Sequence, residues 1–338
     1  MTNTQYDVTR TSGFPDSIIE VRAKTVEDGV VTHLLYNPFS LDSMLAAAIA
    51  LGDPKLGRIV VVPYDRFNGL DAMVEYKHIF CAGVELSEYD FTSCVTKSTH
   101  LTLTAYRDSY AFLDQKKLKK WGDQITLIMP SSEFINSEIA AMDNCASKLL
   151  QIHYYPDFPM PALRKYVDHV ARYTNFMPFK SNLDDDGDST ALQQPIVQAM
   201  LLGLSAALRS VLYSNNPMEL LKDFSVREDV SAYMSHFQNV RMGLRRGLHH
   251  AFYGTRGNAI SVPTMAITEP LFHDTCINAL ITFEFFVGYE DTRTHRVWRI
   301  YADKLSTRQY IAKYLKPHEM WSEGAVLCVS TDRPAVIL

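Results

Sequence analysis

Asp42 is the residue of this chain that is best placed to do chemistry. It lies in the segment LLYNPFSLDSMLAAAIA, residues 34–50. An apolar strand, a polar turn that holds the acid and a helix of small residues place Asp42 near the carboxyl edge of a sheet, where α/β proteins hold ligands. A carboxylate at that edge can bind a divalent cation directly or through water. The alternative is that Asp42 caps the helix that it precedes.

The same segment resembles the opening motif of the DHH phosphoesterase superfamily, which has the pattern H-x-x-x-D-x-D-G or H-x-x-C-x-D-G. In register, Asn37 takes the place of the family histidine, Ser40 that of the first acid or cysteine, and Asp42 that of the second aspartate. Ser43 stands where glycine is usual. The resemblance implies a DHH domain followed by a DHHA1-like domain, in a divergent member whose metal motifs are degenerate.

The next two family motifs are matched at few positions. The family places an aspartate after the following strand and turn, where Gly83 and Glu85 are the nearest matches in this chain. The triplet D-H-H follows a later strand, and its register falls on Thr104, Ala105 and Tyr106. The resemblance therefore implies that neutral side chains occupy most of these ligand positions.

A fourth family aspartate is expected in a helix within residues 166–176. Asp168 is present about one turn early, and Tyr173 is nearer to the expected place. The candidate cleft implied by the resemblance consists of six residues: Asn37, Ser40, Asp42, Glu85, Thr104 and Tyr106.

These replacements bear directly on metal binding. Two adjacent Mn²⁺ or Mg²⁺ ions need several carboxylates and imidazoles to offset their charge and to fix their geometry. Asn, Ser, Thr and Ala supply neutral oxygens or none. We therefore expect no cofactor. The alternative is a single Mn²⁺ or Mg²⁺ ion held by Asp42 and Glu85.

A second segment shows a similar loss. Residues 295–317 resemble the strand and helix of the domain that follows DHH domains and helps to hold substrate. In the family, a glycine-rich run, G-G-G-H-x-x-A-A-G, comes next and brings backbone amides close to a phosphate or base. Residues 318–328, HEMWSEGAVLC, contain one glycine, Gly324. The resemblance thus implies that the second half of the usual substrate site is also missing.

Two charged stretches lie outside these motifs. Arg241, Arg245 and Arg246 belong to a basic cluster late in a predicted long helix, from Val226 to about Ala251. They are candidates to bind phosphate or an RNA strand, or they complement the dipole at the end of that helix. The acidic loop at residues 181–190 lacks the glycine and glutamate positions of an EF-hand, so we interpret it as a solvated loop.

The pattern of elements predicts an α/β fold. The predicted strands of the first domain are Val30–Tyr36, Arg58–Pro63, His78–Ala82, His100–Thr104 and Gln124–Met129. Helical patterns follow them at Leu41–Leu51, Arg66–Tyr76, Ser87–Thr96, Ser131–Leu150, Pro161–Tyr173, Gln194–Leu212 and Pro217–Phe224. Because the strands are apolar throughout and alternate with helices, we expect a mostly parallel, Rossmann-like sheet flanked by helices.

A second, smaller α/β domain is expected after the long connecting helix. Its predicted strands are Ala259–Ile267, His295–Tyr301, Ala325–Ser330 and Ala335–Leu338, with helices at Asp274–Phe285 and Ser306–Leu315. The predicted division is an N-terminal extension at 1–28, a DHH-like domain at 29–224, a connecting helix and linker at 225–257, and a DHHA1-like domain at 258–338.

Composition excludes several classes of protein. A formal net charge of −5 argues against coating nucleic acid by bulk charge. The five cysteines never form a CxxC pair, which favours a reducing compartment. The N-terminus has no signal-peptide pattern, and no apolar run is long enough to span a bilayer. We expect a cytoplasmic protein, in the host cytoplasm if the gene is viral, with no membrane partner.

Three functions remain open. The first is a pseudoenzyme whose scaffold binds a nucleotide, a short nucleic acid or a protein partner. The second is a divergent single-metal phosphodiesterase that acts on short oligonucleotides or cyclic dinucleotides through Asp42, Glu85 and the basic helix. The third is a structural or assembly protein with a vestigial cleft, in which 18 Tyr and 17 Phe residues could serve a homo-oligomeric interface.

Overall fold

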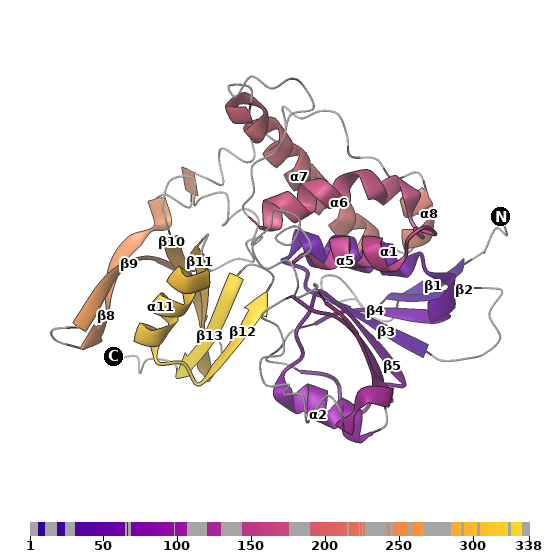
Figure 1. The fold of residues 1–338 in the computed structure, drawn as a ribbon, viewed down its shortest axis with the longest axis horizontal. Helices are drawn as coiled ribbons and strands as arrows, with labels where there is room; N and C mark the ends of the chain where they lie inside the picture. The colour runs from indigo at the N-terminus through magenta and orange to yellow at the C-terminus, as the bar shows by residue number, and fades with distance from the viewer. Residues whose placement is uncertain are drawn as a thin grey trace. The chain divides into compact units, whose positions relative to one another are not determined.

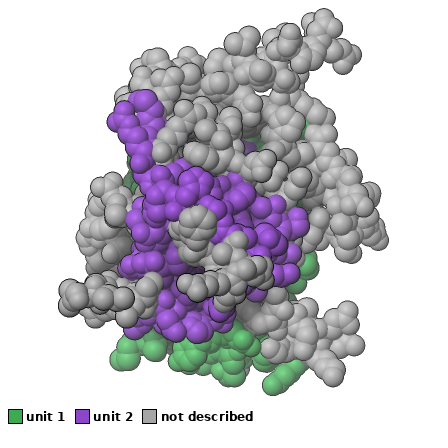
Figure 2. All heavy atoms as spheres, turned by 90° about the vertical axis from the view of Figure 1, so that its left-hand side faces the viewer, with its two compact units in different colours: residues 1–172, 203–227 green, residues 173–202, 228–338 purple. Residues whose placement is uncertain are grey.

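The chain forms two compact units. Unit 1 comprises residues 1–172 and 203–227, and unit 2 comprises residues 173–202 and 228–338 (Figure 2). The computed structural model describes residues 6–10, 19–23, 31–64, 66, 69–97, 99–106, 120–129, 144–175, 190–214, 216–222, 224, 226, 242–243, 246–255, 258–266, 285–291, 294–302, 305–323 and 326–332.

Unit 1 is built on a seven-stranded sheet with the order β1-β2-β4-β3-β5-β6-β7 (Figure 1). Its strands are β1 (Tyr6–Arg10), β2 (Ile19–Ala23), β3 (Val31–Tyr36), β4 (Arg58–Pro63), β5 (His78–Ala82), β6 (His100–Thr104) and β7 (Ile125–Ile128). The strands β4, β3, β5, β6 and β7 are parallel to one another, whereas β1 and β2 extend the sheet in antiparallel pairs. The predicted α/β fold with a mostly parallel sheet is confirmed.

Helices cover both faces of this sheet, which explains the buried apolar run in β3. Leu34 and Leu35 are neighbours in β3 that point to opposite faces, and both are fully buried. One face packs against α1 (Leu41–Leu51), every residue of which is buried, and against α5 (Ala146–His153). The other face packs against α2 (Glu88–Thr96) through Phe91. Figure 1 shows α1 and α5 on one side of the strands and α2 on the other.

Three further α-helices among the described residues up to 227 follow α5 in the chain. They are α6 (Pro161–Thr174), α7 (Thr190–Leu212) and α8 (Pro217–Lys222). Among the described residues, no helix is both long enough and apolar enough to cross a membrane.

The helix predicted at Arg66–Tyr76 is wrong for the residues that the structure describes, which form turns over 69–77. The carboxylate of Asp90 accounts for this local structure, because it accepts hydrogen bonds from the Leu70 backbone N–H at 3.2 Å and from the Tyr64 hydroxyl at 2.8 Å. Gly69 has a φ of +66°, a conformation that favours glycine and that a helix excludes.

Unit 2 is built on a six-stranded sheet with the order β12-β13-β11-β10-β9-β8. Its strands are β8 (His249–Thr255), β9 (Asn258–Ala266), β10 (Phe285–Asp291), β11 (His295–Ala302), β12 (Glu319–Glu323) and β13 (Val326–Asp332). Only the β9–β10 pair among these is parallel. The helix α11 (Leu305–Leu315) packs on one face through Ile311, Ala312 and Leu315.

The long helix predicted to reach Ala251 is wrong at its end, because His249–Thr255 is the strand β8. That strand pairs with β9 in antiparallel register, from His249 opposite Thr264 to Thr255 opposite Asn258. The apolar residues of this segment also have helical spacing, and for this reason the sequence predicted a helix in place of the strand β8. Residues 227–241, and thus most of the predicted helix, lie outside the described residues.

Other predictions also fall outside the described residues. They are the acidic loop at 181–189, most of the helix predicted at Asp274–Phe285, the strand predicted at Ala335–Leu338, and residues 131–143 of the helix predicted at Ser131–Leu150. The compact units also group the chain differently from the predicted division at residues 29, 225 and 258, because β1 and β2 pair into the first sheet and β8 into the second.

A row of threonine and histidine side chains lies where the parallel strands begin. The Thr32 hydroxyl donates its one proton to the Leu56 carbonyl at 2.8 Å. The contact between Thr32 Oγ1 and His78 Nδ1, at 2.9 Å, must therefore have His78 as its donor. His78 Nε2 lies 2.9 Å from the Thr102 hydroxyl. Burial, and then the neighbouring His100 and His33, lower the pKa of His78 to about 4.

We predict that this histidine makes the protein less stable in acid. Because the pKa of His78 lies below its usual value of 6.5, the unfolded chain binds the proton first as the pH falls. Stability is then lost between pH 6.5 and about 4, by at most roughly 3 kcal/mol from this group. Urea unfolding at pH 6.5 and at about pH 4 should show a smaller difference in the free energy of unfolding for His78→Gln than for the wild type. An unchanged difference in His78→Gln would contradict this prediction.

Candidate functional site

The Asp42 carboxylate lies at the centre of a buried hydrogen-bond network in unit 1. Asp42 is fully buried. Its Oδ2 accepts from the Tyr106 hydroxyl at 2.8 Å and from the Ala146 backbone N–H at 2.7 Å. Its Oδ1 accepts from the Cys145 thiol at 2.9 Å and from both the backbone N–H and the hydroxyl of Ser147, at 2.9 and 2.7 Å. Five protein donors therefore surround this one carboxylate.

Asp42 caps a helix, but a different one from the helix predicted. The N-cap of α1 is Ser40, whose hydroxyl accepts from the Ser43 backbone N–H at 3.3 Å. The residues Cys145, Ala146 and Ser147 form the start of α5, and the N-cap residue Cys145 makes no side-chain cap of its own. Asp42, which lies in the first turn of α1, accepts the hydrogen bonds that cap α5. An anion at a helix N-terminus is stabilised by the free N–H groups and by the helix dipole.

Two of the side chains that donate to Asp42, the Tyr106 phenol and the Cys145 thiol, remain protonated. Burial, and then the Asp42 charge, raise the pKa of the Tyr106 hydroxyl well above its usual value. The same two causes, in the same order, raise the pKa of the Cys145 thiol. Each group can therefore donate a hydrogen bond to the carboxylate at neutral pH. Neither group offers the anionic oxygen or sulfur that a metal ion prefers.

The neutral residues at the strand ends are bound to the backbone. The Thr104 hydroxyl accepts from the Gly83 N–H and donates to the Cys81 carbonyl, both at 2.6 Å. The Ser43 hydroxyl accepts from the Asn37 N–H at 2.8 Å and donates to the Ala82 carbonyl at 2.5 Å. These bonds join the ends of β3, β5 and β6, so the hydroxyls serve the fold.

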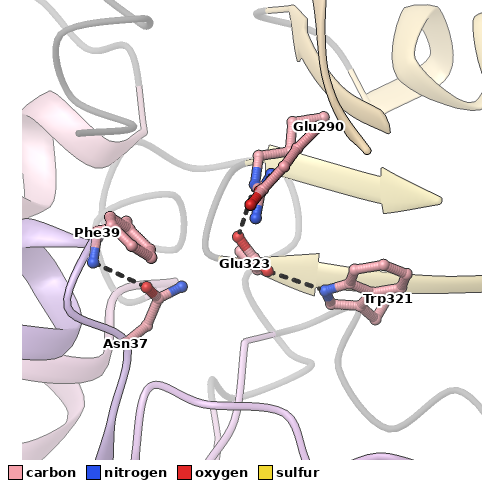
Figure 3. Close-up of polar contacts among 6 residues, drawn as sticks. Asn37, Phe39, Glu290, Trp321 and Glu323 are labelled. Carbon is pink, nitrogen blue, oxygen red and sulfur yellow. Dashed lines mark hydrogen bonds and ion pairs between the residues drawn. The ribbon is translucent and has the colours of Figure 1, made fainter. Parts of the chain in front are cut away.

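Asn37 and Glu85 lie at the margin of this network. The Asn37 side chain accepts from the Phe39 backbone N–H at 2.9 Å, and so shapes the turn before α1 (Figure 3). Glu85 is buried in the loop after β5, where its main-chain carbonyl accepts from Arg66 at 3.1 Å. The described hydrogen bonds to the Asp42 oxygens come from Tyr106 and residues 145–147, and none of them involves Glu85.

The candidate cleft is closed by its own side chains. Ser40, Asp42, Thr104 and Tyr106 are at most 6% exposed. Gly83 is part of this closure, because a Cβ there would lie 2.7 Å from the Tyr106 hydroxyl oxygen and 2.9 Å from the Ala146 Cβ. The Tyr106 side chain thus fills the space beside the strand ends.

These residues do not fit the dinuclear Mn²⁺ or Mg²⁺ centre of the family that the sequence resembles. Such a centre needs several anionic or imidazole ligands around open space. The described part of the chain contains no group of three or more His, Cys, Asp or Glu side chains arranged to hold a metal ion. The one retained carboxylate has its oxygens engaged by donors, which present the same sign of charge as a cation.

The second candidate segment, in unit 2, also pairs its charged side chains with one another. Arg299 in β11 contacts two carboxylates, Glu290 at 3.0 Å and Glu323 at 3.5 Å. The Trp321 ring N–H donates to the other oxygen of Glu323 at 3.0 Å, as Figure 3 shows. Two carboxylates around one guanidinium leave a net negative charge, which disfavours a phosphate. Residues 318–328 contribute to the strands β12 and β13, and Gly324 lies outside the described residues.

The structure describes three of the other predicted residues, Asp168, Tyr173 and Arg246. Asp168 is 61% exposed and forms an ion pair with Lys148 at 2.7 Å. Tyr173 is buried and belongs to unit 2. Arg246 is exposed, whereas Arg241 and Arg245 lie outside the described residues, so the predicted phosphate-binding cluster remains a prediction.

Cys145 and Ser147 belong to the network but were not predicted. Neither residue matches a family motif, and their register with Asp42 depends on the packing of α5. No signal in the sequence marks them, because the helix predicted at Ser131–Leu150 spans both residues without a start at 145.

We predict that Gly83→Ala opens the network. The φ of +66° and the close approach of Tyr106 both oppose a Cβ at this position. The expected loss of stability is about 2 kcal/mol or more, measured by urea unfolding. Gly243→Ala is the control, because a Cβ there meets nothing within 4 Å. Equal stability of the two variants would contradict the packing around Tyr106.

We also predict that Asp42→Asn is strongly destabilising. The amide nitrogen would face donors in place of an acceptor oxygen, which leaves at least two buried polar groups unpaired. The expected cost is roughly 3 kcal/mol or more. Asp168→Asn, which removes an exposed ion pair, should cost less than about 1 kcal/mol. Urea unfolding compares the two, and similar costs would show that the Asp42 network is not needed for the fold.

No protein-family model matches this chain, and no curated protein sequence matches it. Among solved structures it resembles a DHH-domain protein described as a member of a family of ribosomal proteins, with 9% identity, a TM-score of 0.45, and coverage of 90% of this chain and 83% of that one. It also resembles RecJ from Thermus thermophilus in complex with Mn²⁺, with 9% identity, a TM-score of 0.46, and coverage of 90% of this chain and 50% of the RecJ chain.

A third structure is the pGpG-specific phosphodiesterase PggH from Vibrio cholerae, with 11% identity, a TM-score of 0.32, and coverage of 90% of this chain and 93% of that one. All three likenesses are structural, at 9–11% sequence identity.

Proposed function

We propose that this chain is a DHH-like protein that acts by binding and has lost metal-dependent hydrolysis at Asp42. The ligand we propose is a nucleotide, a short nucleic acid or a protein partner. The observation that carries the proposal is the complete engagement of the Asp42 oxygens by five protein donors.

Electrostatics support this proposal. Hydrogen bonds to a charged group contribute about 1.5–3 kcal/mol each, and a metal ion at Asp42 would have to displace several of them. The ion would also lie at the N-terminus of α5, where the helix dipole places about half a positive charge. A cation is therefore disfavoured twice at this position, by the loss of donors and by the field of the helix.

Access supports it as well. A hydrolase must bring the scissile phosphorus to its metal ions or general base, yet the Asp42 side chain is fully buried beneath Tyr106 and the start of α5. The compensated Arg299 in unit 2 offers no net positive charge to hold a phosphate. Both segments that resemble parts of a phosphoesterase site thus have their charges satisfied within the protein.

The test is a metal titration combined with a hydrolysis assay. A metal ion present at 100 times the Kd of its site would raise the free energy of unfolding by about 2.7 kcal/mol. We expect no such stabilisation by millimolar Mn²⁺ or Mg²⁺, and no metal-dependent turnover of bis(p-nitrophenyl) phosphate or a short RNA. Samples with EDTA serve as the control for contaminating metal.

The single-metal phosphodiesterase makes the opposite prediction. It requires Mn²⁺-dependent turnover that is lost in Glu85→Gln, a variant that keeps the size of the side chain and whose folding is checked by circular dichroism. This outcome would overturn the binding proposal even if Asp42→Asn does not fold.

A further inference from the structure

A pocket lies at the opposite ends of the same parallel strands. Thr32, His78 and His100 stand at the beginnings of β3, β5 and β6, side by side in register. They line a pocket of about 410 Å³ together with Lys55, Leu56, Gly57 and Lys77. Asp42 follows β3 at the carboxyl edge, so the amino-edge pocket is separate from the network around it.

The charged residues of the amino-edge pocket have one sign. Lys55 and Lys77 are both exposed, and no Asp or Glu is among the described residues that line the pocket. Lys77 also lines a second pocket of about 660 Å³, which contains one further lysine, Lys97, and one acid, Glu75. In a chain with a formal net charge of −5, this lining is a local reversal of the overall charge.

The hydrogen bonds of the strand ends hold this lining in place. The Thr32 hydroxyl binds the Leu56 carbonyl and so fixes the short 3₁₀ helix Pro54–Leu56, which carries Lys55. The Lys55 backbone N–H donates to the Asp53 carboxylate at 2.8 Å. His78 is neutral at pH 7 and bridges Thr32 and Thr102, so it forms a polar wall without adding charge. The site is therefore organised without its ligand.

We propose that the amino-edge pocket binds a phosphate-bearing small molecule, with the phosphate between Lys55 and Lys77. Two ammonium groups match the charge of a phosphate dianion, and ionised partners form the stronger kind of hydrogen bond. The volume lies in the range of small-molecule sites. The proposal stands apart from the one for Asp42, because it needs neither the presence nor the loss of hydrolysis.

The test is isothermal titration with four probes: inorganic phosphate, adenosine 5′-monophosphate, adenosine, and a ten-nucleotide single-stranded RNA. We expect both small phosphate compounds to bind and adenosine not to bind. Lys55→Gln and Lys77→Gln should each weaken binding of the monophosphate by about tenfold or more. Lys222→Gln, an exposed lysine at the end of α8, should leave it unchanged. Thermal melts verify that the lysine variants fold.

Three outcomes would overturn the proposal. They are no binding of either small phosphate compound, equal binding by the wild type and both pocket variants, and binding of the RNA without binding of the monophosphate. The last result would indicate an extended nucleic-acid surface in place of a small-molecule site. None of these outcomes depends on Mn²⁺, so failure here is distinguishable from failure of the proposal for Asp42.

Discussion

A buried carboxylate needs a full set of donors, and this constraint organises unit 1. Moving an ionised side chain out of water costs several kcal/mol unless hydrogen bonds replace the lost water. Asp42 receives them from Tyr106, after β6, and from residues 145–147, at the start of α5. The carboxylate therefore joins α1, the end of β6 and α5. Movement of any one of these elements would leave the charge unsatisfied.

The same principle applies to any buried carboxylate that has no cation to balance it, because it then requires other partners. Here the partners are a phenol, a thiol, a hydroxyl and the N-terminus of a helix. Arg299 in unit 2 is satisfied in an analogous way by two glutamates. In contrast, Lys55 and Lys77 line a pocket whose described residues include no acid.

The success of the sequence prediction followed the strength of the local signals. The strands β3 to β7 were predicted to within one residue, because each is a short run rich in apolar or β-branched residues. The Arg66–Tyr76 prediction failed because apolar residues at helical spacing can also line a turn, and Asp90 from α2 holds this one. β8 was missed for a related reason, because its apolar residues also fit a helical period.

For the candidate site, the sequence by itself determined that Asp42 follows a buried strand and that neutral residues stand at the other strand ends. Both facts depend only on residue type and order along the chain. Only the tertiary structure decided what Asp42 does. Two of its five donors are backbone N–H groups, which every residue except proline carries and which leave no trace in a sequence. Their convergence on Asp42 depends on the packing of α5, more than 100 residues away.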